Sequence, residues 1–524
     1  MEVGTVTSTS SFPFLTIIVL LPLISGLVLA FVPTSRDKLA RSLALAVSLV
    51  EVVFAVAILG MFKTGDASYQ LVSRHEWMGT LGISWSLGID GVSLFLVILV
   101  TVLFPIVFVG AIPKANKASF VSWLLILEGA CLGSFLSLDA FEFFIYFELT
   151  LIPTYFIVVG WGGAKRNAAA VKFFIYTLFG SAFLFVGILV IAAMHYQQTG
   201  ILTFDISQLA TTHMSYTTQV LLFLSFTVAF LVKTPVFPFH TWSPDAYSES
   251  PIAGAIIMSG VMAKLGTYGI LRFDLNLFPK ASWNLAPLLL TLAVIGIIYG
   301  AVVAAGQKDF KRLVAYSSLS HLGFIILGIF AFSSQGLSGG VLQMFNHGIV
   351  TAGMFLIIGF IAKRTGTWQL TRLKGIQRVA PVLAGAMMIV VLAGLGLPGL
   401  NGFVGEFLIL LGTFVTHRWW AVVALGGVIL SAVYLLWAYQ RAFHGSPSEE
   451  LSSKIKELKP IEALAIAPLI AFIFFIGVYP QPMLDKINPT VTQIVARVDK
   501  ANNISVNKGA IPNAITQTKK ELTK

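Results

Sequence analysis

Long apolar stretches dominate the chain, and short polar segments separate them. Fourteen of these stretches approach or exceed the roughly 20 residues that an α-helix needs to cross a bilayer. Their limits are 12–32, 39–62, 89–111, 119–138, 141–161, 168–194, 217–240, 251–273, 286–305, 314–332, 339–362, 379–416, 419–443 and 461–478. The pattern predicts an all-α polytopic membrane protein with about fourteen transmembrane helices.

Two of the predicted spans contain an interruption. Span seven (217–240) carries Lys233, and Pro235 and Pro238 follow within five residues. Each proline removes a backbone N–H and frees a carbonyl one turn earlier, so this helix should break beside the lysine. Span twelve (379–416) is too long for one straight crossing and contains the glycine-rich string GLGLPGLNG. We therefore predict broken helices in spans seven and twelve.

The composition agrees with a membrane protein. Hydrophobic residues make up 57% of the chain and charged residues 11%, against about 25% charged residues in soluble domains. The single cysteine, Cys131, allows no internal disulfide and no CxxC pair for zinc or an iron–sulfur cluster. Any redox chemistry is therefore expected to belong to a partner protein.

Basic residues are distributed unevenly between the loops. Nineteen follow odd-numbered spans: Arg36, Lys38, Arg41, Lys114, Lys117, Lys165, Arg166, Lys308, Lys311, Arg312, Lys363, Arg364, Arg372, Lys374, Arg378, Arg441, Lys454, Lys456 and Lys459. Five lie in the loops after even-numbered spans: Lys63, Arg74, Arg272, Lys280 and Arg418. The C-terminal tail after span fourteen adds seven more basic residues on that side. By the positive-inside rule, the odd loops face the cytoplasm and both termini the opposite, lumenal side. The net charge of +11 then reflects topology and requires no nucleic acid.

Several ionisable residues fall near the middle of their predicted spans. A charge at the bilayer centre costs at least about 2.5 kcal/mol, so such residues are rarely accidental. The mid-depth groups are Lys233, Lys264, Glu51, Glu128, Glu148, Glu406, His321 and His347. A lone histidine at this depth can be a helix–helix hydrogen bond, and a lone acid or lysine can be half of a static pair. At least six such groups on different spans favour a proton relay instead.

A proton relay requires groups that gain and lose protons. Burial disfavours the charged form of a lysine or a glutamate, and a nearby opposite charge restores it. Glu148 and Lys233 could therefore act as a switchable pair. When the carboxylate is near, the lysine holds its proton; when the carboxylate moves away, the lysine releases it.

The residues give little support to a bound cofactor or metal. His321 and His347 could suggest bis-histidine haem, but no second histidine pair exists at matching depth. The string GLGLPG at 394–399 matches GxGxxG, yet it lies within an apolar span and not between a strand and a helix. We expect no cofactor and no metal in this chain.

The order of the breaks suggests an internal duplication. Spans four to eight (119–273) and nine to thirteen (286–443) each place the interrupted helix fourth, and an odd span count makes the two repeats inverted. The remaining units are an N-terminal three-helix segment (1–118) and the last helix with a polar, solvated tail (444–524).

Several strings resemble a known family. They are FELTLIPTYFIVVGWGGAKR, FLVKTPVFPFHTWSPDAYSESP, GVMAKLGTYGILRF, KRLVAYSSLSHLGF, QMFNHGIVTAG and GLPGLNGFVGEF. In this order they resemble the antiporter-like proton-pumping membrane subunits of respiratory complex I, of the chain M or chain 4 type. The resemblance implies fourteen spans, inverted five-helix repeats and no redox centre in the chain. It also implies partners: other antiporter-like subunits, quinone-site subunits and surrounding lipids.

The resemblance assigns roles by position. Glu148 and Lys233 match the family's gating ion pair, and Lys264 matches its bridging lysine. The other relay positions are the central histidines His321 and His347, the terminal acid Glu406 of the second half-channel, and Glu128 as a secondary member.

One loop departs from the family pattern. The family usually reads LPDAH after the first break, whereas this chain reads SPDAY, with Ser243 and Tyr247. A tyrosine does not take up a proton near pH 7, so a loop proton donor at Tyr247 is in doubt.

The opening FPFLTIIVLLP and WGGAKR look closer to cyanobacterial and plastid versions. We therefore expect a thylakoid complex that takes electrons from NAD(P)H or ferredoxin. Its iron–sulfur clusters and plastoquinone would lie in other subunits. The divergent loop would suit a carbon dioxide uptake paralogue. The alternatives are a cation/proton antiporter subunit of a multi-subunit sodium exporter and a structural subunit that has lost pumping.

Overall fold

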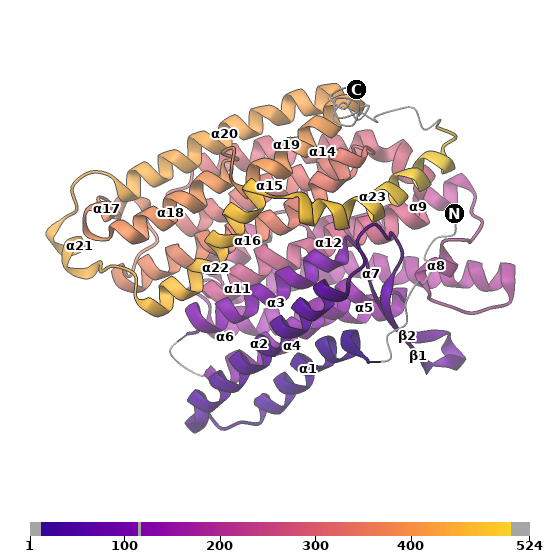
Figure 1. The fold of residues 1–524 in the computed structure, drawn as a ribbon, viewed down its shortest axis with the longest axis horizontal. Helices are drawn as coiled ribbons and strands as arrows, with labels where there is room; N and C mark the ends of the chain where they lie inside the picture. The colour runs from indigo at the N-terminus through magenta and orange to yellow at the C-terminus, as the bar shows by residue number, and fades with distance from the viewer. Residues whose placement is uncertain (1–11, 114–116, 505–524) are drawn as a thin grey trace, which may run out of the picture.

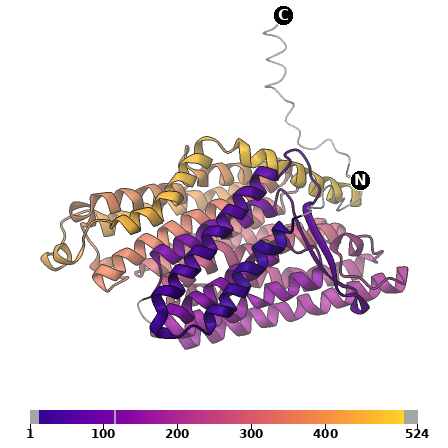
Figure 2. The same ribbon diagram turned by 60° about the horizontal axis from the view of Figure 1, so that its bottom comes forward.

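The computed structural model describes residues 12–113 and 117–504, nearly all of them in helices that form one elongated bundle (Figures 1 and 2). In Figure 1 the N-terminal helix α1 lies at one edge of the bundle and α20 at the opposite edge. The two termini, which we predicted to be lumenal, lie outside the described residues.

Each predicted span contains helical structure. Spans one to six correspond to α1 (Phe14–Ala30), α2 (Asp37–Met61), α3 (Ser93–Gly110), α4 (Lys117–Leu136), α5 with α6 (Ala140–Leu149, Leu151–Trp161) and α7 (Arg166–Thr199). Spans seven to eleven correspond to α9 (Tyr216–Lys233), the stretch Ile252–Leu277, α14 (Pro279–Ala305), α15 (Phe310–Ile329) and α16 (Ser334–Thr365). Spans twelve to fourteen correspond to α18 (Pro381–Gly394) with α19 (Asn401–Thr416), α20 (Arg418–Phe443) and α22 (Pro460–Val478).

Length and apolar composition support these assignments. Within the described ranges, twelve helices are long and apolar enough to cross a membrane. The other two predicted spans correspond to shorter apolar helices, α1 and the interrupted pair α18 and α19. The polytopic helical class is confirmed.

The predicted break in span seven is present at the lysine. Helix α9 ends at Lys233, and turns lead from there to the short helix α10 (Ser243–Glu249). The Trp242 indole donates a hydrogen bond of 2.9 Å to the Val232 carbonyl. Pro235 has no N–H for the Leu231 carbonyl, so the Val236 amide bonds that carbonyl at 3.0 Å, and the indole satisfies the Val232 carbonyl in place of Val236.

The predicted break in span twelve separates α18 from α19. Gly396 and Gly399 have φ of 78° and 91°, a backbone conformation that residues with a Cβ rarely adopt. A Cβ on Gly402 would lie 2.0 Å from the Ala393 carbonyl oxygen, so the two half-helices meet closely. Glycine is therefore required at the break for both turn geometry and packing.

Span eight is irregular in a way that the sequence pattern did not predict. It runs through α11 (Ile252–Ile257), a π-helical turn (Met258–Met262), α12 (Ala263–Gly269), a second π-helical turn (Ile270–Asp274) and α13 (Leu275–Leu277). Single π turns inside helices often occur at functional sites. All of the span's most apolar window is buried.

Two further elements were not predicted. An antiparallel hairpin of β1 (Gln70–Met78) and β2 (Ile83–Ile89) adds a small sheet to the expected all-α fold. Helix α23 (Gln481–Ala501) packs on α13, α14 and α16 (Figure 1). Its buried residues recur at helical spacing: Met483, Ile487, Thr490, Val491, Ile494 and Val498. The solvated tail that we expected is therefore wrong for residues 481–501. The remaining short helices are α8 (Ile206–Leu209), α17 (Ile376–Val379) and α21 (Glu449–Lys454).

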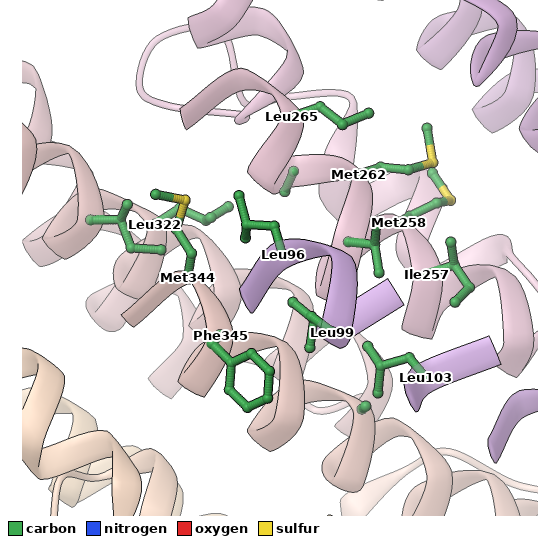
Figure 3. Packing of buried hydrophobic residues seen from close by; sticks show 14 of the residues in the cluster. Leu96, Leu99, Leu103, Ile257, Met258, Met262, Leu265, Leu322, Met344 and Phe345 are labelled. Atoms are coloured by element: carbon green, nitrogen blue, oxygen red, sulfur yellow. The ribbon is translucent and has the colours of Figure 1, made fainter. Parts of the chain in front are cut away.

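Tight apolar packing encloses the middle of the bundle. Side chains of α3, span eight, α15 and α16 interlock there, among them Leu99, Met262 and Phe345 (Figure 3). A Cβ on Gly348 would lie 2.9 Å from the Gly260 carbonyl oxygen, so α16 and span eight touch through their backbones. This packing excludes water from around α12 and so raises the cost of any charge placed there.

Candidate functional site

Lys233 is held at the junction of α5 and α6. Its side chain is buried at the end of α9, and Nζ donates to Thr150 Oγ1 at 2.7 Å and to the Phe147 carbonyl at 3.2 Å. The ammonium also lies 4.4 Å from the centre of the Phe147 ring. Thr150 is the residue between the two helices, so the kink in span five presents the acceptors to the lysine.

Glu148 lies beside this site but forms no ion pair with Lys233. The half-buried carboxylate has Ser181 of α7 as a hydrogen-bonding neighbour and interacts electrostatically with Lys233. The two side chains form no ion pair within 4.0 Å. The structure therefore brings the predicted partners to one junction and shows them in a separated arrangement.

Lys264 is fully buried inside the bundle. It lies in α12 between the two π-helical turns and has no exposed surface. Nζ donates to the Ser259 carbonyl at 2.6 Å and lies 2.5 Å from His347 Nδ1. An imidazole at this distance can exchange a proton with the lysine directly.

The two predicted histidines face each other across a small cavity. The rings of His347 on α16 and His321 on α15 have centres 5.8 Å apart. Neither Nε2 atom has a hydrogen-bond partner among the described residues. A cavity of about 10 Å³, lined by both histidines, lies here; one water requires about 10 to 15 Å³.

Glu406 completes this chain of contacts. Its Oε1 lies 2.8 Å from His321 Nδ1 and accepts a hydrogen bond of 3.2 Å from Gln343 Nε2. The carboxylate reaches back toward the break in span twelve, where a Cβ on Gly396 would lie 2.9 Å from Oε2. The break thus makes room for the acid.

Glu128 lies outside this chain of contacts. Glu128 on α4 and Glu51 on α2 are fully buried and interact with each other. Among the described residues, none of their four carboxylate oxygens has a hydrogen-bond partner. Cys131, one turn beyond Glu128, is the neighbour that links this acid pair to the surroundings of Lys233.

Tyr247 does not occupy the position of a solvent-facing proton donor. Its side chain is fully buried, and its hydroxyl donates to the Met258 carbonyl at 3.4 Å. Nearby Asp245 forms ion pairs with Lys172 at 2.8 Å and Arg312 at 3.0 Å. SPDAY, which we expected to be a loop, lies in helix α10. Its charged residue is the aspartate, which connects α10 to α7 and α15.

Uncharged residues complete the site, and the sequence analysis missed them. They are Thr150, Ser259, Gln343 and Asn346, which contact Lys233, Lys264, Glu406 and the Asn401 carbonyl. A signal was present for Gln343, which stands one helical turn before His347. In residues 12–113 and 117–504, no group of three or more His, Cys, Asp or Glu side chains could hold a metal ion.

Residues 137–432 match the family described as NADH:quinone oxidoreductase/Mrp antiporter, TM. The chain is 39% identical over 528 residues to NADH-quinone oxidoreductase subunit M of Mycobacterium tuberculosis, covering 93% of this chain and 95% of that protein. It is 37% identical to NADH-ubiquinone oxidoreductase chain 4 of Marchantia polymorpha, covering 91% and 96% of the two chains.

Two solved structures have a similar fold. A chain of respiratory complex I from Thermus thermophilus with bound NADH superposes with a TM-score of 0.84 at 30% identity, over 92% of this chain and 99% of that chain. A chain of the Mrp complex from Dietzia sp. gives a TM-score of 0.80 at 22% identity, over 92% and 98% of the two chains. The second likeness concerns the fold alone.

Proposed function

The chain belongs to the antiporter-like membrane subunits of respiratory complex I, and from this premise we propose that a buried Lys–His–His–Glu chain carries its protons. It is a proton-translocating subunit of the subunit M, or chain 4, type. Its place is in the membrane, beside other subunits of a multi-subunit complex.

The observation that supports the proposal is the run of contacts from Lys264 to Glu406. Lys264 Nζ passes a proton to His347 Nδ1 across 2.5 Å. His347 releases its Nε2 proton through one water in the small cavity to His321 Nε2, and His321 Nδ1 delivers a proton to Glu406 across 2.8 Å. Each imidazole accepts on one nitrogen and releases from the other, so no ring needs to leave its place.

Lys233 supplies the proton to this chain. We take the separated arrangement of Glu148 and Lys233 as the releasing state of the switch. Without its carboxylate partner the buried ammonium contacts a hydroxyl, a carbonyl and the Phe147 ring, which stabilise its charge less than a carboxylate does. Approach of Glu148 would let Lys233 take up the next proton.

The loop charges indicate how the proposed path is oriented in the membrane. Nineteen basic residues follow odd-numbered spans, whereas the even side has five in its loops and seven in the C-terminal tail, and this excess supports a cytoplasmic position for the odd loops. We propose that protons enter from that side beside Lys233 and leave beyond Glu406. The two inverted repeats, 119–273 and 286–443, would each supply one half of this path.

A matched pair of histidine substitutions tests the relay. In the assembled complex, His347→Gln should lower the number of protons moved per electron at least severalfold, because glutamine cannot relay a proton. His195→Gln is the control. His195 is buried to a similar degree, but it stands near the C-terminal end of α7 and bonds Thr212, outside the proposed relay. The measurement is the number of protons moved per quinone reduced, in proteoliposomes that contain each variant. A wild-type ratio in assembled His347→Gln complex would exclude the relay.

The finer expectations remain predictions. Reduction of plastoquinone, electrons from NAD(P)H or ferredoxin, a thylakoid location and carbon dioxide uptake were inferred from short strings. The relatives above are named NADH-quinone and NADH-ubiquinone oxidoreductases. The subunit list and the bound quinone of the purified complex would decide between these assignments. A complex without iron–sulfur subunits would indicate a sodium-exporting antiporter instead.

A further inference from the structure

A cavity of about 1220 Å³, here called the vestibule, has Asp90 and Arg272 among its lining residues. Its walls come from the segment before β1, the connection between α7 and α9, the start of α14 and helix α23. These segments follow spans two, six, eight and fourteen, all even-numbered. Under the orientation proposed above, the vestibule therefore opens on the non-cytoplasmic side.

Three buried residues line the vestibule, Tyr69, Asp90 and Arg272, and Arg272 also bonds the buried Tyr268; we call these four side chains the plug. Arg272 Nη1 lies 2.8 Å from Asp90 Oδ2 and donates to the Tyr69 hydroxyl at 2.7 Å. Its Nε donates to the Tyr268 hydroxyl at 3.0 Å. The guanidinium carbon lies 5.0 Å from the centre of each tyrosine ring.

The two halves of the ion pair are anchored differently. Asp90 Oδ1 accepts hydrogen bonds from the Val92 and Ser93 amides at the start of α3, which fixes the carboxylate. Arg272 stands in the π-helical turn Ile270–Asp274, where the backbone hydrogen-bond register is irregular. The backbone at the start of α3 therefore anchors Asp90, whereas Arg272 is held through its side-chain bonds to Asp90, Tyr69 and Tyr268.

The plug lies close to Lys264 along the same span. Tyr268 is four residues after Lys264 in α12, which is about one helical turn. Its hydroxyl also donates to the Phe135 carbonyl at 2.8 Å, so it closes the space between span eight and α4. An arginine stays charged, so Arg272 itself cannot relay a proton between the vestibule and Lys264.

We propose that the vestibule is a second water route to Lys264 and that the plug closes it. Displacement of Arg272 from Asp90 would let water in the vestibule reach Lys264, and Lys264 Nζ could then release its proton directly to that water. The route goes beyond the Glu406 exit, although it rests on the proposed role of Lys264. In the closed state the plug prevents protons from returning to the relay.

The test uses the assembled complex in liposomes with an imposed pH gradient. The double variant Asp90→Asn/Arg272→Gln keeps hydrogen-bonding groups in place and leaves no unpaired charge. It should dissipate the gradient severalfold faster than wild type while still reducing quinone. Arg74→Gln is the matched control, because it breaks an arginine–aspartate pair on the same side whose Arg74 side chain is 48% exposed. If the double variant dissipated the pH gradient no faster than wild type, the proposal would be overturned.

Adding Lys264→Ala to the double variant tests the connection. The leak should return toward the wild-type rate, because the route passes through that lysine; an undiminished leak would overturn this. The outcome is separable from the relay hypothesis. A leak in the double variant together with normal pumping in His347→Gln would keep the plug and exclude the relay.

A labelling experiment keeps the proposal testable if the double variant does not assemble. Asn276 lines the vestibule and donates to the Arg272 carbonyl at 3.0 Å, and the chain's only cysteine, Cys131, is buried. A membrane-impermeant thiol reagent should label this subunit's Asn276→Cys variant from the non-cytoplasmic side alone. Absence of labelling, or labelling from the cytoplasmic side, would contradict a vestibule open to that side.

Discussion

At the scale of single residues, the site depends on which atoms approach each relay group. Glu406 reaches His321 because Gly396 leaves room beside it: a Cβ there would lie 2.9 Å from Glu406 Oε2. Lys233 depends on Thr150, whose hydroxyl accepts from the ammonium and donates to the Phe147 carbonyl at 2.8 Å. Gly396 and Thr150 are both small and uncharged, and each one determines where an ionisable side chain lies.

Gly396→Ala should impair proton transfer while the complex still assembles. The new methyl group would push the Glu406 carboxylate away from His321, and the positive φ adds a strain of about 1 kcal/mol. Gly399→Ala is the control, because its φ of 91° carries the same strain but a Cβ there meets nothing within 4 Å. Protons per electron should fall in the first variant alone. Equal loss in both variants would assign the effect to strain.

Thr150→Val should weaken the hold on the Lys233 ammonium. A hydrogen bond to a charged group contributes about 1.5 to 3 kcal/mol, and its loss favours the neutral lysine. We expect the number of protons moved per electron to differ from the wild-type value in Thr150→Val. It should return to that value in Thr150→Ser, which restores the hydroxyl. Thr154→Val is the control one turn further along, since Thr154 bonds the Thr150 carbonyl and not the lysine. Identical pumping in Thr150→Val and wild type would refute this role.

At the scale of elements, irregular helices place the reactive groups. Lys233 ends a helix at a proline break, Lys264 stands between two π-helical turns, and Glu406 follows a glycine break. An interrupted helix exposes backbone carbonyls and lets a side chain approach from the end, which a regular helix does not allow. The carbonyls of Phe147 and Ser259 that bind the two lysines show this use directly.

Helix α23 stabilises the bundle from one side. Val491 is fully buried on the face toward the other helices, whereas its neighbour Thr492 is exposed. Val491→Asp should therefore lower the thermal stability of the complex or block its assembly, because an unpaired carboxylate costs several kcal/mol to bury. Thr492→Asp should leave the melting temperature within a degree or two. Equal melting temperatures for both variants would show that α23 does not pack as described.

At the scale of the whole molecule, Asp245 connects the two proposed repeats. It pairs with Lys172 on α7 and with Arg312 on α15, and all three side chains are 35% to 38% exposed. Exposed pairs contribute about 0 to 1 kcal/mol each, so Asp245→Asn should change stability little. We expect Asp245→Asn instead to lower the number of protons moved per electron, because the two repeats lose the carboxylate that pairs with both Lys172 and Arg312. Glu450→Gln, which breaks the surface pair with Lys454, should change neither quantity.

The sequence alone was sufficient for features that depend on local chemistry. A run of apolar residues predicts a span wherever it stands, and proline or glycine interrupts a helix through its own backbone. The breaks beside Lys233 and Glu406 were therefore predictable, and so was the unusual cost of charges at mid-depth. Helix α23 was missed because its apolar residues recur at helical spacing and form no long apolar run, which was the pattern used to place the spans. The π-helical turns were missed because packing against α4 and α16 contributes to them.

Only the tertiary structure decided which groups meet. Lys264 and His347 are 83 residues apart, and His321 and Glu406 are 85 apart, so no local pattern could pair them. Sequence placed Glu128 with the relay, but packing gave it Glu51 as a neighbour instead. Arg272 counted as a loop cation, yet the fold buries it against Asp90 and two tyrosines. Hydropathy is a property of each segment, whereas a proton path is a property of distances between segments.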